Sequence, residues 1–147
     1  MQKTVKSIIE AGNNGVAIDV ECFLSNSLPN IVIVGFANKS TDEAKERIRG
    51  AFSSSNIRLP RKRITINLAP ADIPKAGSSF DLAMVVSILQ GGKLVSHACP
   101  DDTIVLGEVG LDGSVRAIRG VIGKILAARK QGYSKFWIPK ANADQAH

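Results

Sequence analysis

Cysteine and aromatic residues are both scarce in this sequence, and each shortage excludes a class of function. The 147 residues include two cysteines, Cys22 and Cys99, too few for a disulfide framework and without the spacing of a metal site. We expect both to be small interior residues, because free cysteine is mostly buried. Aromatic residues make up 5% of the chain, which leaves few side chains to stack on single-stranded nucleic acid.

Long apolar runs are also missing. No run approaches the ~20 residues needed to cross a bilayer, and residues 1–15 lack the apolar core of a signal peptide. These absences predict a cytoplasmic protein that does not contact a membrane. The GxxxxGK[ST] pattern of a P-loop is absent too, so we expect no nucleotide site of that kind.

The composition is otherwise that of one globular domain in which Lys and Arg outnumber Asp and Glu. Hydrophobic residues make up 44% and charged residues 22%, and the formal net charge is +6. A positive charge is compatible with a nucleic-acid partner but does not establish one. The densest basic cluster contains the candidate nucleic-acid contacts Arg58, Arg61, Lys62 and Arg63. Arg47 and Arg49 are a possible extension of this cluster. The alternative is that all of these residues form an ordinary solvated surface.

Apolar periodicity predicts strands and helices without strict alternation. A glycine-rich turn predicts a hairpin between residues 5–10 and 16–23, and a continuous apolar run predicts a buried strand at 31–34. Later strands are expected at 61–68, 104–109, 114–118 and 136–139. Helices are expected behind the capping box Ser40-x-x-Glu43, at 80–89 and from 121 to 130. We therefore predict an α+β (α/β layered) domain with a mixed sheet.

The centre of the chain is the stretch 67–89, which predicts a strand, a loop and a buried helix. Ser79 is expected to be the N-cap of that helix, worth ~1 kcal/mol. Asp81 is either part of the cap or a buried hydrogen-bond acceptor. The residues expected to structure the loop are Asn67, Asp72, Lys75 and Asp81. Lys75 is also expected to be exposed, with a phosphate contact as the alternative.

Several segments together resemble one family, the N-terminal domain of the magnesium chelatase-like, ComM-type AAA+ ATPases. The segments are SNSLPNIVIVG, DEAKERIRGAF, RITINLAPADIPKAGSSFDLAMVV, LGEVGLDGSVRAIRGV and IPKANA. The resemblance implies the ribosomal protein S5 domain 2-like fold, which also occurs in the Lon protease domain and the C-terminal domain of RadA.

The same resemblance implies that residues 1–147 form a single Lon/RadA-like domain, the N-terminal fragment of a longer ATPase. ATP and magnesium are then expected in the downstream module, with no cofactor and no metal in this chain. The expected partners are that module, other copies in a hexameric ring, and DNA, since the family is associated with branch migration in natural transformation.

Residues 74–79, PKAGSS, are similar to the nucleophile loop PKDGPS of Lon proteases and place Ser79 at the nucleophile position. A serine nucleophile needs a neighbouring base, but the matching lysine position holds Ile122. Lys124 lies about 200° further around the helix, so we expect it to point away while Ile122 joins a core stripe with Ile125 and Leu126. This pattern predicts that the chain has no catalytic residues and is not an enzyme.

Three functions remain open from the sequence: a non-catalytic accessory domain that supports ATPase assembly and DNA processing, a DNA-binding module, and a Ser-Lys peptidase of the Lon type. A metal site is not predicted, since His97, Cys99, Asp101 and Asp102 match no standard ligand spacing.

Overall fold

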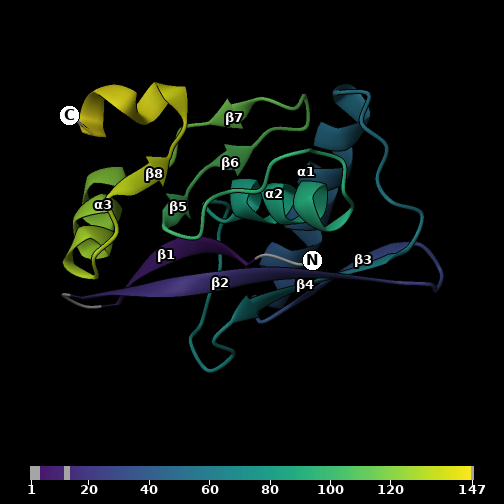
Figure 1. Cartoon of the computed structure of the whole chain (residues 1–147), viewed down its shortest axis with the longest axis horizontal. Helices are drawn as coiled ribbons and strands as arrows, with labels where there is room; N and C mark the ends of the chain where they lie inside the picture. The colour runs from purple at the N-terminus through teal and green to yellow at the C-terminus, as the bar shows by residue number, and fades with distance from the viewer. Residues whose placement is uncertain (1–3, 12–13, 147) are drawn as a thin grey trace.

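The computed structural model describes residues 4–11 and 14–146, which form an α+β fold around a six-stranded mixed sheet (Figure 1). The strand order is β3-β4-β2-β1-β5-β8. The strands are β1 (Val5–Ala11), β2 (Asn14–Ser25), β3 (Asn30–Val34), β4 (Arg63–Ala69), β5 (Thr103–Val105) and β8 (Lys135–Trp137). Strands β1, β2 and β4 are antiparallel, whereas β3, β5 and β8 add in parallel. The predicted layered fold class and mixed sheet are confirmed.

Helices lie on both faces of this sheet (Figure 1). The helices are α1 (Asn38–Ser54), α2 (Asp81–Gly91), α3 (Val121–Lys130) and the 3-10 helix η1 (Lys140–Ala146). Val5 packs into the α1/α2 core and Ile8 into the α3 core, and these two positions of β1 point to opposite faces. Within the described ranges, no helix is both long and apolar enough to span a bilayer.

Strand β2 shows why the hairpin could be predicted. Ile18, Val20 and Cys22 are buried at alternate positions, as expected for a strand with one face on the core. Val5 of β1 lies opposite Val20. The turn residues Gly12 and Asn13 lie outside the described residues.

Strand β3 is an edge strand, although its apolar run predicted a buried one. Ile31 and Ile33 are buried, whereas Val34 is 46% exposed. Successive side chains of a strand point to opposite faces of the sheet. Val34 is exposed because no helix of the described residues covers its face at this end of the sheet (Figure 1). A run of four apolar residues cannot by itself reveal this difference.

The first two helices begin at residues set by tertiary hydrogen bonds rather than by side-chain caps. Helix α1 has Ala37 at its N-cap and α2 has Phe80, both without a side-chain cap bond. The predicted capping box at Ser40 and the predicted N-cap role of Ser79 are therefore wrong. The Ser40 hydroxyl instead accepts a hydrogen bond from the Gly77 amide at 3.2 Å.

Helix α1 carries the predicted apolar stripe: Ala44, Ile48, Ala51 and Phe52 are all buried. Helix α3 does not. Ile122 and Leu126 are 52% and 53% exposed, and the buried residues are Val121, Ala127 and Ala128. The cause is a close approach to β2, where a Cβ added to Gly15 would lie 2.7 Å from the Ala127 Cβ. Small side chains permit this approach, and the larger ones face outward.

A buried ion pair joins α1 to α2. The Arg47 guanidinium donates to both Asp81 carboxylate oxygens, at 2.6 and 3.0 Å, and the Asp81 side chain is fully buried. The Val109 amide, in the short strand β6 (Glu108–Val109), donates to the same carboxylate at 3.1 Å. Hydrogen bonding to Asp81 raises the pKa of Arg47, so the guanidinium stays charged. Asp81 is thus the buried acceptor, and Arg47 is not a solvated surface residue.

Replacing Arg47 with methionine should lower the free energy of unfolding by about 3–5 kcal/mol, because it leaves a buried carboxylate without its cation. Urea-induced unfolding measures this loss. The control is Arg49→Met on the same helix, whose exposed pair with Glu46 spans 3.4 Å and should contribute under about 1 kcal/mol. Equal losses in the two variants would contradict this account of the pair.

Candidate functional site

The loop 70–79 is built around a buried lysine. Lys75 is 3% exposed, so its predicted exposure is wrong. Its amine donates to the carbonyl oxygens of Pro70 and Ile73, at 2.5 and 2.6 Å. Burial lowers the pKa of Lys75, opposed by the nearby charge of Asp72. Lys75 therefore stabilises the loop from its interior.

Two further hydrogen bonds fix this loop to the start of α1. The Ala37 amide donates to the Lys75 carbonyl at 3.0 Å, and the Gly77 amide donates to Ser40. Gly77 has φ +89°, a left-handed conformation that glycine adopts without strain. The loop enters α2 with a defined backbone path.

The Ser79 backbone is fixed beside β6. The Gly107 amide donates to the Ser79 carbonyl at 3.1 Å, and the Leu82 amide donates to the Gly107 carbonyl at 3.0 Å. A Cβ on Gly107 would lie 3.1 Å from Val115 and 3.2 Å from Leu82. A glycine at this position thus lets the loop approach the short hairpin of β6 and β7 (Val115–Arg116).

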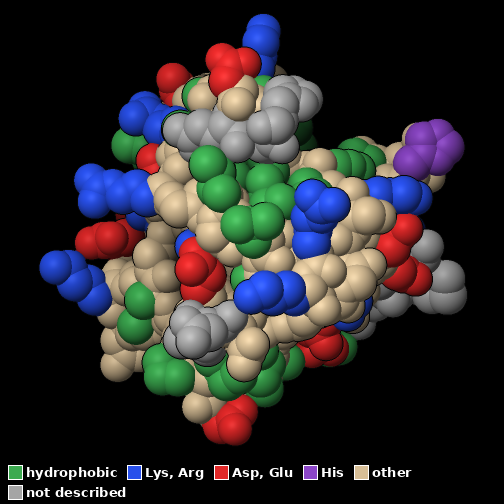
Figure 2. Space-filling model, turned by 90° about the vertical axis from the view of Figure 1, so that its left-hand side faces the viewer, with side chains coloured by type: hydrophobic (Ala, Val, Ile, Leu, Met, Phe, Trp, Pro, Cys, Tyr) green, Lys and Arg blue, Asp and Glu red, His purple; other side chains and the backbone are tan. Residues whose placement is uncertain are grey.

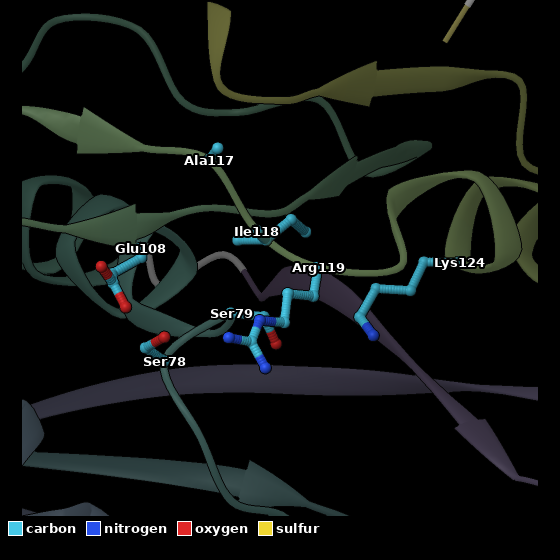
Figure 3. A pocket seen from close by; sticks show the side chains of 7 residues that line it. All are labelled: Ser78, Ser79, Glu108, Ala117, Ile118, Arg119 and Lys124. Atoms are coloured by element: carbon cyan, nitrogen blue, oxygen red, sulfur yellow. The ribbon is translucent and has the colours of Figure 1, made fainter. Parts of the chain in front are cut away.

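A cleft of about 530 Å³ opens beside Ser79, between this loop, β6 and the segment leading into α3 (Figure 3). It is lined by Ser78, Ser79, Glu108, Ala117, Ile118, Arg119 and Lys124. Lys124 was predicted to point elsewhere, and that prediction is wrong. The small residues of α3 face β2, which turns Lys124 toward the cleft and Ile122 toward solvent.

Ser79 and Lys124 both line the cleft, but no hydrogen bond links their side chains in the described residues. Within residues 4–11 and 14–146, neither the Ser79 hydroxyl nor the Lys124 amine has a hydrogen-bond partner. Figure 3 shows the Arg119 side chain extending toward Ser79 as well. A guanidinium keeps its proton in proteins and cannot serve as a base. The arrangement suits binding of a polar ligand better than removal of a proton from the serine.

Asn67 does not fix the loop backbone as predicted, whereas Asp72 acts on the loop by its charge. The Asn67 amide donates to Glu21 on β2 at 3.3 Å, and the two residues lie opposite each other across the strands. Asn67 therefore supports strand pairing. Asp72 is exposed and acts on the loop through its charge on Lys75.

The predicted basic cluster lies at another place on the surface. Arg58, Arg61, Lys62 and Arg63 are all exposed. Arg61 and Lys62 line a hollow of about 200 Å³ together with Arg49. Arg49 thus belongs to this group, whereas Arg47 does not.

The residues considered for a metal have other surroundings. Cys99 is buried, and burial raises the pKa of its thiol to about 11. Asp102 forms an ion pair with Lys135 at 3.1 Å. Among the residues the structure describes, no three His, Cys, Asp or Glu side chains gather as a metal site would require.

Comparison with known proteins gives a consistent set of relatives. A family model described as subunit ChlI of Mg-chelatase matches residues 20–142. Competence protein ComM of Haemophilus influenzae is 37% identical over 97% of this chain and 28% of its own length. The uncharacterized protein YifB of Escherichia coli is 36% identical over 91% and 26%. A Lon protease of Finegoldia magna is 37% identical over 55% of this chain and 10% of its own length. The chain thus spans about a quarter of the length of its ComM and YifB relatives.

Replacing Lys75 with methionine should lower the free energy of unfolding by about 1–3 kcal/mol, because two carbonyl oxygens lose a charged donor. Faster hydrogen exchange of the Ala37 and Gly77 amides should accompany this loss. The control is Lys39→Met, at an exposed position of α1.

The difference in stability between the wild type and the Lys75→Met variant should depend on pH. Since the folded pKa of Lys75 lies below its ordinary 10.5, the unfolded chain binds more protons between the two values. The wild type should therefore gain stability relative to the methionine variant as the pH rises toward 10.5. A stability difference that stays constant with pH would contradict the buried ammonium.

Proposed function

This chain belongs to the family of the ChlI subunit of Mg-chelatase, and from that premise we propose that it is a non-catalytic accessory domain of a magnesium chelatase-like AAA+ ATPase. One observation carries the proposal. Ile122, at the position where a Lon-type peptidase has its lysine, is 52% exposed and points away from the Ser79 cleft.

The remaining amine in the cleft does not replace that lysine. Lys124 makes no hydrogen bond to Ser79 among the described residues, and it lies in the first turn of α3, on the same surface as the charged Arg119. A serine hydroxyl is a weak nucleophile until a base removes its proton. The absence of a base bonded to Ser79 supports a non-catalytic role for this cleft.

The work of the parent protein then falls to other modules. The chain spans 28% of the length of ComM, a competence protein by name, which leaves most of such a protein for an ATPase. We place ATP and magnesium in that module and propose that this domain supports ring assembly and DNA processing in the cytoplasm, including branch migration during transformation.

The parent protein provides the test in three forms: intact, with Ser79→Ala, and without residues 1–147. Loss of the domain should impair assembly, measured by sedimentation, and DNA-stimulated ATP hydrolysis. The Ser79→Ala form should match the intact protein in both, and neither should cleave casein. Cleavage that depends on Ser79, or full activity without the domain, would refute the proposal.

A second candidate function is direct DNA binding through the exposed basic cluster. The observation that favours it is the hollow at which Arg49, Arg61 and Lys62 meet, close in sequence to the exposed Arg58 and Arg63. Phosphate groups bind to such clusters through charge. The shortage of aromatic residues favours backbone contacts over base stacking.

Fluorescence anisotropy with labelled duplex DNA tests this candidate. The double variant Arg61→Ala/Lys62→Ala should bind DNA about tenfold more weakly at low salt. The slope of the logarithm of the binding constant against the logarithm of the salt concentration should become shallower by about 2, because two phosphate contacts are lost. The charge-matched control is Lys39→Ala/Lys130→Ala, at exposed positions outside the cluster. No binding at low salt, or equal weakening in both variants, would exclude this function for the domain.

A further inference from the structure

Helix α3 presents an apolar surface to solvent. Ile122 and Leu126 are 52% and 53% exposed and lie one helical turn apart, so they share one side of the helix. Beside them is a hollow of about 360 Å³ between α3 and β8, lined by Ile125, Arg129, Ser134, Phe136 and Ile138. Figure 2, which views the molecule from the α3 side, shows hydrophobic side chains gathered among Lys and Arg side chains.

The charge of the molecule is concentrated in the same segment. Residues 113–143 contain seven Lys and Arg and no Asp or Glu, which leaves twelve cations and thirteen acids elsewhere. The seven are Arg116, Arg119, Lys124, Arg129, Lys130, Lys135 and Lys140. These residues do not form a dense cluster in the sequence, because they are spread over the segment from β7 to η1. The segment is brought together in the fold, where η1 packs against both β7 and α3.

Most of these charges remain available to a partner. Among the described residues, Lys135 forms an ion pair, with Asp102, and the other six form none. Helix α3 itself contains no acidic residue. The α3 face consists of the outward side chains Ile122 and Leu126, with Arg129 and Lys130 at the end of the helix.

The chemistry of the α3 face favours a protein over a nucleic acid. An apolar centre with a charged rim is the usual anatomy of a protein-protein interface, whereas protein-DNA interfaces are more polar throughout. A phosphate backbone would contact the basic rim and leave Ile122 and Leu126 without an apolar partner. A partner surface that complements the α3 face would be apolar at its centre and would carry carboxylates around that centre.

We propose that the α3 face docks on an acidic, apolar-centred surface of the ATPase module in the same polypeptide. This inference rests on the proposed function, which supplies that module. Covalent attachment raises the effective concentration of the two surfaces, so an interface of moderate size suffices. Ile122 then has a role of its own: the residue that replaces the lysine of the hydrolase pattern forms part of the docking surface.

Photo-crosslinking in the full-length parent protein tests the occupant. Benzoylphenylalanine replaces Leu126, and the control places it at Leu28, which is 85% exposed and lies between β2 and β3. The expected result is a crosslink from position 126 to a segment of the ATPase module that contains Asp or Glu, without the same product from position 28. Crosslinks from position 126 to DNA, to lipid or to this domain of another copy would overturn the proposal.

Charge variants of the parent protein test the energetics. Leu126→Glu and the double variant Arg129→Glu/Lys130→Glu should each weaken assembly at least tenfold at low salt, and Leu28→Glu should stay within twofold of the intact protein. Circular dichroism verifies that each variant is folded. If deletion of residues 1–147 impairs assembly while the α3-face variants do not, the docking face is wrong and the accessory function stands. If neither has an effect, the accessory function itself fails.

Discussion

The carboxylate of Asp81 is the point on which three parts of the fold depend. It lies in the first turn of α2, is fully buried, and accepts hydrogen bonds from Arg47 of α1 and from the backbone of Val109 in β6. A buried charge is costly unless its partners are well placed. The relative positions of α1, α2 and β6 are therefore coupled to one another through a single side chain.

The candidate cleft is a consequence of that coupling. Ser78 and Ser79 immediately precede the α2 end that Asp81 holds, and Glu108 is the neighbour of Val109 on β6. The backbone bonds between Ser79, Gly107 and Leu82 act over the same short distance. Two walls of the cleft are thus set by interactions that do not involve its own side chains.

The sequence predicted the elements of the fold well and their surroundings less well. Alternation in β2 and the apolar stripe of α1 depend on local periodicity, which a single sequence contains. The ends of the helices depend on remote partners, as when Ser40 binds the Gly77 amide instead of capping α1. The orientation of α3 depends on side-chain size at its contact with Gly15, so hydrophobicity alone placed Ile122 and Leu126 on the wrong side.

The same limit applies to the candidate site. The motif around Ser79 predicted a loop that leads into α2, but not the cleft beside it. Lys75 was expected to be exposed because residue type alone does not show that the carbonyl groups of Pro70 and Ile73 enclose its amine. Whether Lys124 faces the cleft depends on the rotation of α3. The errors at Lys124 and at the helix ends share a cause, since each concerns a contact between segments distant in sequence. The error at Lys75 differs, because its partners Pro70 and Ile73 belong to the same loop.

The contact between Gly15 and Ala127 also limits how the surface of α3 can change over time. Because there is no room for a larger residue at the inner positions, substitutions there require the helix to move, and with it Lys124 at the cleft. Outer positions carry no such restriction. The outer residues of α3 can therefore vary while the contact between α3 and β2 stays the same.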